Sequence, residues 1–297
     1  IKPIVGCEFY LVENRHRQQF TKDDKDVRYH QLMLAKNAEG YKNLIKLCSL
    51  GYMEGLYGKY PRIDKELVLQ YHKGLIATTC CLGAEVPRTI LRKGEEEAEK
   101  VFQWWLDLFG EDYYVELQRH SIPEQMKVNE VLLKFAKKYN VKIIASNDSH
   151  YVDQKDSNAH DILLCLNTGA KQNDTKIKDV SGVGEDATLK TKERFAFFND
   201  QFYFKGTTEM NQLFSDLPEA IDNTNEIVGK IEMLKLKQDI MLPNFPIPVE
   251  FQTHTQPEKV DDKTTLTPET LNQWEYLRHL TFIGAKKRYG DISPDIE

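Results

Sequence analysis

Long hydrophobic runs are absent from this sequence, and cysteine is scarce. No apolar run approaches the roughly 18–20 residues that a membrane-spanning helix needs, so we expect no membrane association. The five cysteines include no CxxC pair and no even disulfide framework, which favours reduced thiols in a cytoplasmic protein. The chain opens directly into a β-type pattern, so we expect no signal peptide.

Basic residues are not in excess either, because the formal net charge is −6. This total argues against a broad nonspecific nucleic-acid surface, but it leaves open a local basic groove or a metal acting on phosphate. The 297 residues, 40% hydrophobic and 29% charged, suffice for one large or two ordinary globular domains. The first residue is not Met and lies within a pattern, so we expect part of the protein to precede Ile1.

Strand-like and helix-like segments alternate through residues 1–150. This alternation predicts a largely parallel sheet with crossover helices, whose ligands gather at the carboxyl ends of the strands. The predicted strands are residues 2–6, 29–36, 75–79, 113–117 and 141–146. The predicted helices are residues 37–50, 64–71, 85–92, 95–109 and 123–139.

Four of the predicted strand ends carry a side chain that can bind a metal or form hydrogen bonds. These side chains are Glu8, Cys81, His120, and Asp148 with His150. Random placement would rarely produce this arrangement, so we expect a site at this edge of the sheet. His30 opens its strand instead of ending it, and the rule for parallel sheets does not explain its position.

The segment from Lys142 to Tyr151 is the most informative. An apolar run ends abruptly in Asn-Asp-Ser-His, and Asp148 and His150 are two residues apart, so an extended backbone directs both side chains to one face. A carboxylate and an imidazole at the mouth of a buried strand suit a divalent transition metal. The alternative is an Asx-type turn that leaves His150 on the surface.

The pattern changes after Tyr151. Residues 171–195 and 251–267 are polar and predict a surface loop and a low-order linker. Further helices are predicted at residues 156–169, 208–214, 218–231 and 268–289. The last of these is amphipathic, and its leucines and Trp274 predict a packing face for a further module.

A set of short motifs occurs in a specific order along the chain. The set comprises GCE (6–8), HQLMLAKN (30–37), PRID (61–64), CLGAEVP (81–87), ELQRH (116–120), NDSHY (147–151), DQFY (200–203), NTNEI (223–227) and LPNFP (242–246). Together they resemble the amino-terminal region of the alpha subunit of bacterial DNA polymerase III. That region is a PHP (polymerase and histidinol phosphatase) domain followed by the start of the polymerase module.

The resemblance implies an α/β fold, a PHP-type incomplete (β/α) barrel followed by a mainly helical connector into the polymerase module. Residues 1–235 would form the PHP domain, and residues 236–297 the linker and first elements of the palm and thumb region. The family's first motifs, an HxH pair and a TDH-type segment, would lie before Ile1. The polymerase's catalytic aspartates would lie beyond Glu297, so this fragment should not itself polymerise DNA.

The resemblance also implies a cluster of two or three divalent metal ions, with zinc, manganese and magnesium as candidates. The matching ligand positions are Glu8, His30, Cys81, Asp148 and His150. His120 matches a pocket residue and Cys80 a packing residue, and no catalytic side chain is assigned.

Two functions follow from the resemblance. The first is phosphoester hydrolysis, as in 3′–5′ exonuclease proofreading, within a DNA-directed DNA polymerase. The second is a catalytically silent scaffold that stabilises the polymerase and docks a separate proofreading exonuclease. In both, the implied partners are DNA and replicase subunits such as that exonuclease and the sliding clamp, in the cytoplasm.

Overall fold

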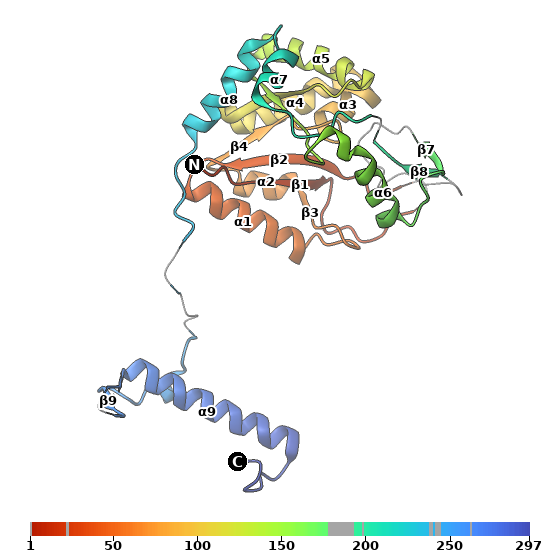
Figure 1. The fold of residues 1–297 in the computed structure, drawn as a ribbon. Helices are drawn as coiled ribbons and strands as arrows, with labels where there is room; N and C mark the ends of the chain where they lie inside the picture. The colour runs from red at the N-terminus through yellow and green to blue at the C-terminus, as the bar shows by residue number, and fades with distance from the viewer. Residues whose placement is uncertain are drawn as a thin grey trace. The chain divides into compact units, whose positions relative to one another are not determined.

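The computed structural model describes residues 2–21, 24–177, 193–197, 199–237, 240, 245–261 and 263–297. The chain divides into two compact units, unit 1 from Ile1 to Leu234 and unit 2 from Lys235 to Glu297 (Figure 1). Among the described residues, no helix combines the length and apolarity needed to cross a bilayer.

Unit 1 is an α/β structure in which helices and strands alternate. Its strands are β1 (Gly6–Val12), β2 (Tyr29–Ala35), β3 (Arg62–Asp64), β4 (Leu75–Thr78), β5 (Tyr113–Gln118), β6 (Ile143–Ser146), β7 (Thr175–Ile177) and β8 (Glu193–Phe195). Its helices are α1 (Ala38–Met53), α2 (Lys65–Tyr71), α3 (Glu85–Lys93), α4 (Glu95–Phe109), α5 (Pro123–Tyr139), α6 (Ser157–Thr168), α7 (Thr207–Leu213) and α8 (Pro218–Lys230).

The central sheet has six strands in the order β3-β1-β2-β4-β5-β6. Strand β2 runs antiparallel to both of its neighbours, whereas β4, β5 and β6 are mutually parallel. The expectation of a largely parallel sheet holds except at β2, which is the one strand of this sheet that runs opposite to the others. The reversal also explains His30, since the beginning of β2 lies at the same edge as the carboxyl end of β4.

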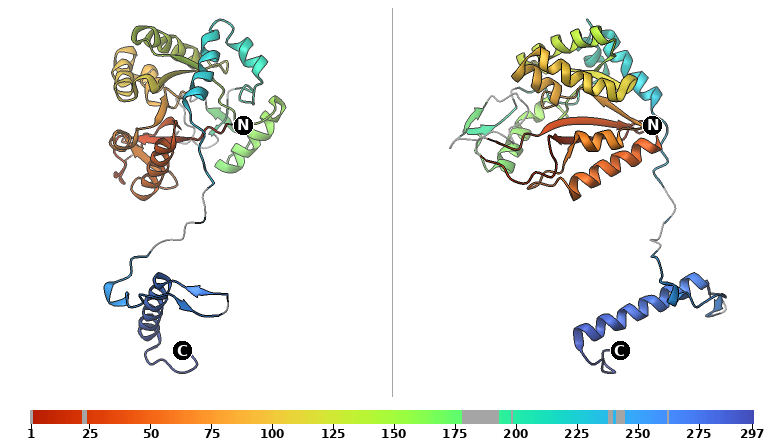
Figure 2. Two further views of the ribbon diagram at one scale, coloured as in Figure 1. Left: turned by 90° about the vertical axis from the view of Figure 1, so that its left-hand side faces the viewer. Right: turned by 180° about the vertical axis from the view of Figure 1, so that it is seen from behind.

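The two faces of the sheet differ in what covers them. Alternate strand residues such as Phe9, Met33 and Val115 face a large apolar core, which packs against helices α1 to α5. The opposite face, hereafter the inner face, carries a smaller apolar cluster of Ile76, Ile144 and residues of α8. Figure 2 shows α1, α3, α4 and α5 on one side of the sheet and α6 and α8 on the other. Because α8 covers only one end of the inner face, the polar side chains at its other end can form a site.

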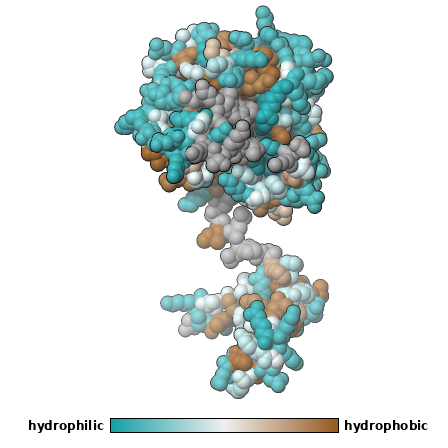
Figure 3. All heavy atoms as spheres, turned by 90° about the vertical axis from the view of Figure 1, so that its right-hand side faces the viewer, coloured by the Kyte–Doolittle hydropathy of each residue, from teal (hydrophilic) through white to brown (hydrophobic). Residues whose placement is uncertain are grey.

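Most predicted elements of unit 1 occur where the sequence places them, with two differences. The first strand is Gly6–Val12 instead of residues 2–6, so Glu8 lies inside a strand and not at its end. The predicted loop at residues 171–195 contains the paired strands β7 and β8, and its residues 178–192 lie outside the described part. Figure 3 shows that the described surface on the side of unit 1 that carries α6 is mainly hydrophilic.

The described part of unit 2 contains a short 3-10 helix (Val249–Phe251), strands β9 (Glu258–Lys259) and β10 (Thr265–Leu266) and helix α9 (Pro268–Tyr289). The strands pair with each other inside the predicted low-order linker, so that segment is more ordered than expected. Helix α9 has the predicted bounds, and the Thr267 side chain caps its N-terminus by accepting a hydrogen bond from the Thr270 amide. Trp274 and Leu277 on α9 are exposed. The assignment of this unit to the start of a polymerase module stays a prediction.

Candidate metal centre

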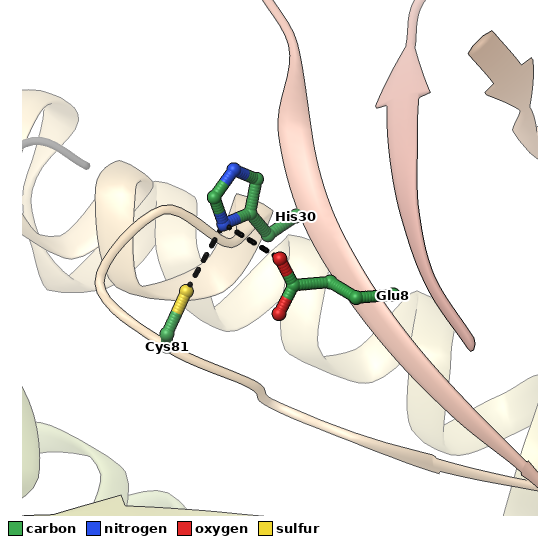
Figure 4. A group of neighbouring side chains, drawn as sticks. All are labelled: Glu8, His30 and Cys81. Atoms are coloured by element: carbon green, nitrogen blue, oxygen red, sulfur yellow. Dashed lines mark hydrogen bonds and ion pairs between the residues drawn. The ribbon is translucent and has the colours of Figure 1, made fainter. Parts of the chain in front are cut away.

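Glu8, His30 and Cys81 converge on the inner face of the sheet. Each offers one ligand atom, and these atoms all lie within 4.8 Å of one another. The Nδ1 atom of His30 lies 3.3 Å from Sγ of Cys81 and 3.2 Å from Oε1 of Glu8. Figure 4 shows Glu8 and His30 extending from neighbouring strands and Cys81 from the loop after β4, with all three side chains pointing toward one another.

The strand register places these side chains together. Glu8 pairs with Leu32, and His30 lies two residues from Leu32, so Glu8 and His30 lie diagonally on one face of the β1–β2 pair. The loop after β4 then passes beside His30, whose amide donates a hydrogen bond to the Gly83 carbonyl over 3.0 Å. A Cβ atom at position 83 would lie 2.9 Å from Nδ1 of His30, so only glycine lets the loop approach this closely.

The three groups perturb one another's ionisation. The hydrogen bond from the Cys80 thiol, together with the bond and charge of His30, lowers the pKa of the Cys81 thiol to about 6 despite burial. Burial acts to lower the pKa of His30, but Cys81 and the acidic groups around it outweigh this effect and raise that pKa to about 9. Partial removal from water raises the pKa of the Glu8 carboxyl, although about half of this side chain stays exposed (51%).

Asp148 and His150 form a second acid–imidazole pair beside this group. Nε2 of His150 lies 3.2 Å from Oδ1 of Asp148. Burial acts to raise the pKa of the Asp148 carboxyl, but the hydrogen bond and charge of His150 and the charge of His30 lower it. Asp148 in turn raises the pKa values of Glu8 and His30, so the pair lies close enough to act electrostatically on the first group.

His120 holds the segment that carries Asp148. Its ring is buried and stacks on Phe202 with centroids 4.7 Å apart, and Nδ1 lies 3.2 Å from Nε2 of Gln125. Nε2 accepts a hydrogen bond from the Asp148 backbone amide over 3.3 Å, and burial lowers the pKa of the ring. A neutral His120 therefore positions the Asp148 backbone, and its role as a pocket residue stays a prediction.

Glu116 is a buried acid of this region that the sequence interpretation did not assign. It lies in the middle of β5, where burial raises the pKa of its carboxyl. Its oxygens accept hydrogen bonds from Thr78 on β4, from Ser146 at the end of β6 and from Gln118. The sequence feature that could have indicated this role is a Glu inside the apolar run YYVEL. In the structure, the hydrogen bonds of its side chain join three parallel strands.

The predicted ligands thus fall into two neighbouring sets. The structure brings Glu8, His30 and Cys81 within reach of one ion and holds Asp148 with His150 beside them. Cys80 is buried, as expected of a packing residue, and its backbone has the left-handed φ of 56°. His160 received no role from the sequence, yet its ring lies 5.8 Å from that of His150.

The donor set fits a divalent transition metal. A thiol with a lowered pKa, an imidazole and a carboxylate are ligands that zinc accepts in tetrahedral sites. Their ligand atoms already converge, since all three lie within 4.8 Å of one another. A carboxylate and an imidazole of the second pair are available to an adjacent ion.

Comparisons with known proteins give a consistent result. Residues 1–120 match the family model of the PHP domain. The chain is 39% identical to the DNA polymerase III subunit alpha of Borreliella burgdorferi over 298 residues, which cover 100% of this chain and 23% of that protein. The corresponding protein of Thermus aquaticus is 36% identical, with 98% of this chain and 21% of that protein covered. The protein of Treponema pallidum is 33% identical, with 100% and 22% covered.

The chain therefore spans less than a quarter of the length of these relatives. The mixed six-stranded sheet with its alternating helices agrees with the barrel-like fold of the matching family. The chain carries a PHP domain, and along its full length it belongs with the N-terminal part of DNA polymerase III alpha subunits.

Proposed function

We propose that the chain is the N-terminal part of a bacterial replicative DNA polymerase III alpha subunit, which acts on DNA in the cytoplasm. The similarity along the whole chain to proteins of that name supports this proposal. In it, DNA-directed DNA synthesis and contacts with a proofreading exonuclease and a sliding clamp belong to the parent protein. The chain's own contribution is the metal centre.

The activity proposed for that centre is hydrolysis of the phosphodiester at the 3′ end of DNA. The observation that carries it is the convergence of Glu8, His30 and Cys81 within 4.8 Å, with Asp148 and His150 beside them. A PHP metal site of this composition would use two or three ions. The Cys81 thiolate favours zinc, while the carboxylates also suit manganese or magnesium.

The protein side chains have separate tasks in this proposal. Divalent ions lower the pKa of water and stabilise charge on the attacking and leaving oxygens of a phosphodiester. Glu8 and Asp148 balance the charge of the ions, and His30 and His150 would serve as neutral ligands. His120 keeps the Asp148 backbone in place through the amide hydrogen bond at Nε2.

A second candidate is a silent scaffold that stabilises the polymerase and docks a separate proofreading exonuclease. One observation favours it: within the described residues, only a single set of three side chains has ligand atoms in mutual reach. The extensive core on one face of the sheet would suit a purely supporting role equally well.

Digestion of single-stranded DNA labelled at its 5′ end tests the two candidates. The full-length gene product, its Asp148→Asn variant and a matched Asp107→Asn variant on the exposed side of α4 would be compared without deoxynucleoside triphosphates. The nuclease proposal expects manganese- or zinc-dependent shortening from the 3′ end that Asp148→Asn abolishes and Asp107→Asn retains. Equal digestion by both variants, or none by the unaltered protein, supports the scaffold.

A further inference from the structure

A cavity of about 330 Å³ lies beside the metal centre, and its lining includes residues of α6, β7 and β8. This volume is in the range of small-ligand pockets. Tyr151, which directly follows His150, forms part of the wall, together with His160 and Phe197. The metal-centre proposal does not use this cavity, so its ligand is a separate question.

The cavity shares an aromatic wall with the metal centre. The Phe197 ring lies 4.5 Å from the ring of His150 on one side and 4.9 Å from that of His160 on the other. Tyr151 and His160 also contact each other, with centroids 5.2 Å apart. A flat group against these rings would therefore lie directly next to His150.

The charges that line the cavity compensate one another. Arg194 is fully buried and forms two hydrogen bonds with Asp161, from Nη1 over 2.7 Å and from Nη2 over 2.9 Å. The lining holds one further cation, Lys176, and one further carboxylate, Asp200, which accepts hydrogen bonds from Gln154 and Gln201, so its formal charges balance. A phosphate would find no uncompensated positive charge here, so the walls favour a neutral, polar ligand.

The polar wall also offers hydrogen bonds to such a ligand. The Gln172 side chain donates to Asn158 over 2.9 Å and to Asp161 over 3.1 Å. Among the described residues, Nδ2 of Asn158 and Oε1 of Gln172 have no partner, which leaves one donor and one acceptor. Nε of Arg194 is a further buried donor without a partner in that part of the chain.

From this geometry we infer that the cavity binds the 3′-terminal nucleobase of a single-stranded nucleic acid. Stacking on aromatic side chains and hydrogen bonds to the base edge are the means by which proteins hold unpaired bases. The inference rests on the proposed function, because it places the adjoining phosphodiester at the metal centre. Phe197 then positions the substrate and His150 adjoins the scissile end.

Photo-crosslinking tests the inference without relying on hydrolysis. The probe is single-stranded DNA with 4-thiothymidine at its 3′ end, mixed with the full-length gene product without divalent ions. Mass spectrometry should locate the crosslink at Tyr151, His160 or Phe197. A probe that carries the same base at an internal position should give little crosslinking at these residues. An excess of DNA with an abasic 3′ end should reduce crosslinking of the 3′-terminal probe only slightly.

Variants provide matched comparisons. Because Leu removes the aromatic ring on which a base would stack, Phe197→Leu should reduce crosslinking at the cavity about tenfold, while Phe204→Leu on the exposed surface should not. Gln172→Ala, at an exposed position, should reduce crosslinking at the cavity less than Phe197→Leu does, and it should leave the thermal unfolding curve unchanged. Crosslinks elsewhere, equal effects of Phe197→Leu and Phe204→Leu, or full competition by the abasic DNA would overturn the inference.

A base-free diester separates this inference from the proposed function. Metal-dependent hydrolysis of bis(p-nitrophenyl) phosphate needs the metal centre but no base pocket. Hydrolysis without crosslinking in the cavity would contradict only the base-binding inference. Crosslinking without hydrolysis of the diester would contradict only the proposed hydrolase function.

Discussion

Nδ1 of His30 lies 3.3 Å from Sγ of Cys81, and this contact links the antiparallel strand β2 to the loop after β4. It stabilises a thiolate beside an imidazolium, because the pKa of Cys81 is lowered to about 6 and that of His30 is raised to about 9. The lowered thiol pKa adds stability that is lost as pH falls through about 6, and the raised imidazole pKa adds stability that is lost as pH rises through about 9. Without a metal, the ion pair between His30 and Cys81 therefore adds most stability between about pH 6 and about pH 9.

Cysteine alkylation as a function of pH tests this pair. In a Cys48→Ser background, which removes the exposed thiol, Cys81 should react with iodoacetamide at a rate that rises through about pH 6. Burial raises the pKa of Cys7, and the hydrogen bond to Cys81 together with burial raises the pKa of Cys80, so these two thiols should react slowly at neutral pH. His30→Gln should slow the alkylation of Cys81 at neutral pH, and bound zinc should protect the Cys81 thiol from alkylation. If the alkylation rate of Cys81 beside an unaltered His30 rises only near the ordinary pKa of a thiol, Cys81 is not a thiolate at neutral pH and this prediction is refuted.

Gly83→Ala tests the close approach of the loop to His30. The added methyl group would lie 2.9 Å from Nδ1, so the imidazole must move away from Cys81. Metal affinity measured by competition with a chromogenic chelator should fall by about 10–100-fold, the usual effect of disturbing a group that orients a ligand. Gly229→Ala in α8, where a Cβ meets nothing within 4 Å, is the matched control and should bind normally. Equal affinities for both variants would mean that Gly83 does not set the position of His30.

Glu116→Ala tests the buried acid that joins β4, β5 and β6. The substitution leaves the donors on Thr78, Gln118 and Ser146 without their common acceptor. Leaving buried polar groups unpaired costs about 1–3 kcal/mol, so the free energy of unfolding in urea should drop by at least that amount. Glu130→Ala on the exposed side of α5 should leave it unchanged. An unaltered urea midpoint for Glu116→Ala would show that these hydrogen bonds contribute little.

The fold was largely predictable where periodicity and capping agree. The helix predicted at residues 268–289 has the same bounds as α9. Asp64, where the helix of residues 64–71 was predicted to begin, caps α2 by accepting a hydrogen bond from the Leu67 amide. Strand direction was not predictable in the same way, because an apolar run reads alike in both directions. The reversed direction of β2 was therefore missed, and with its antiparallel pairing to β4 the reason that His30 can reach Cys81.

The candidate site was predictable in its residues but not in its arrangement. The order of the motifs pointed to Glu8, His30, Cys81, Asp148 and His150, whose roles as metal ligands stay a prediction. Glu116 and Gly83 were missed because their importance depends on neighbours that are distant in sequence. The side chains around His160 were missed for the same reason, since Phe197 is far from His150 along the chain.

Zinc content and affinity test most directly whether these side chains form one metal centre. Equilibrium dialysis followed by elemental analysis would compare the full-length gene product with its Cys81→Ser, Asp148→Asn and Cys165→Ser variants. We predict bound zinc whose affinity falls at least about tenfold in Cys81→Ser and in Asp148→Asn, while Cys165→Ser, a buried thiol of α6, binds normally. Absence of bound zinc and manganese from the unaltered protein, or equal binding by all variants, would contradict a metal centre at these residues.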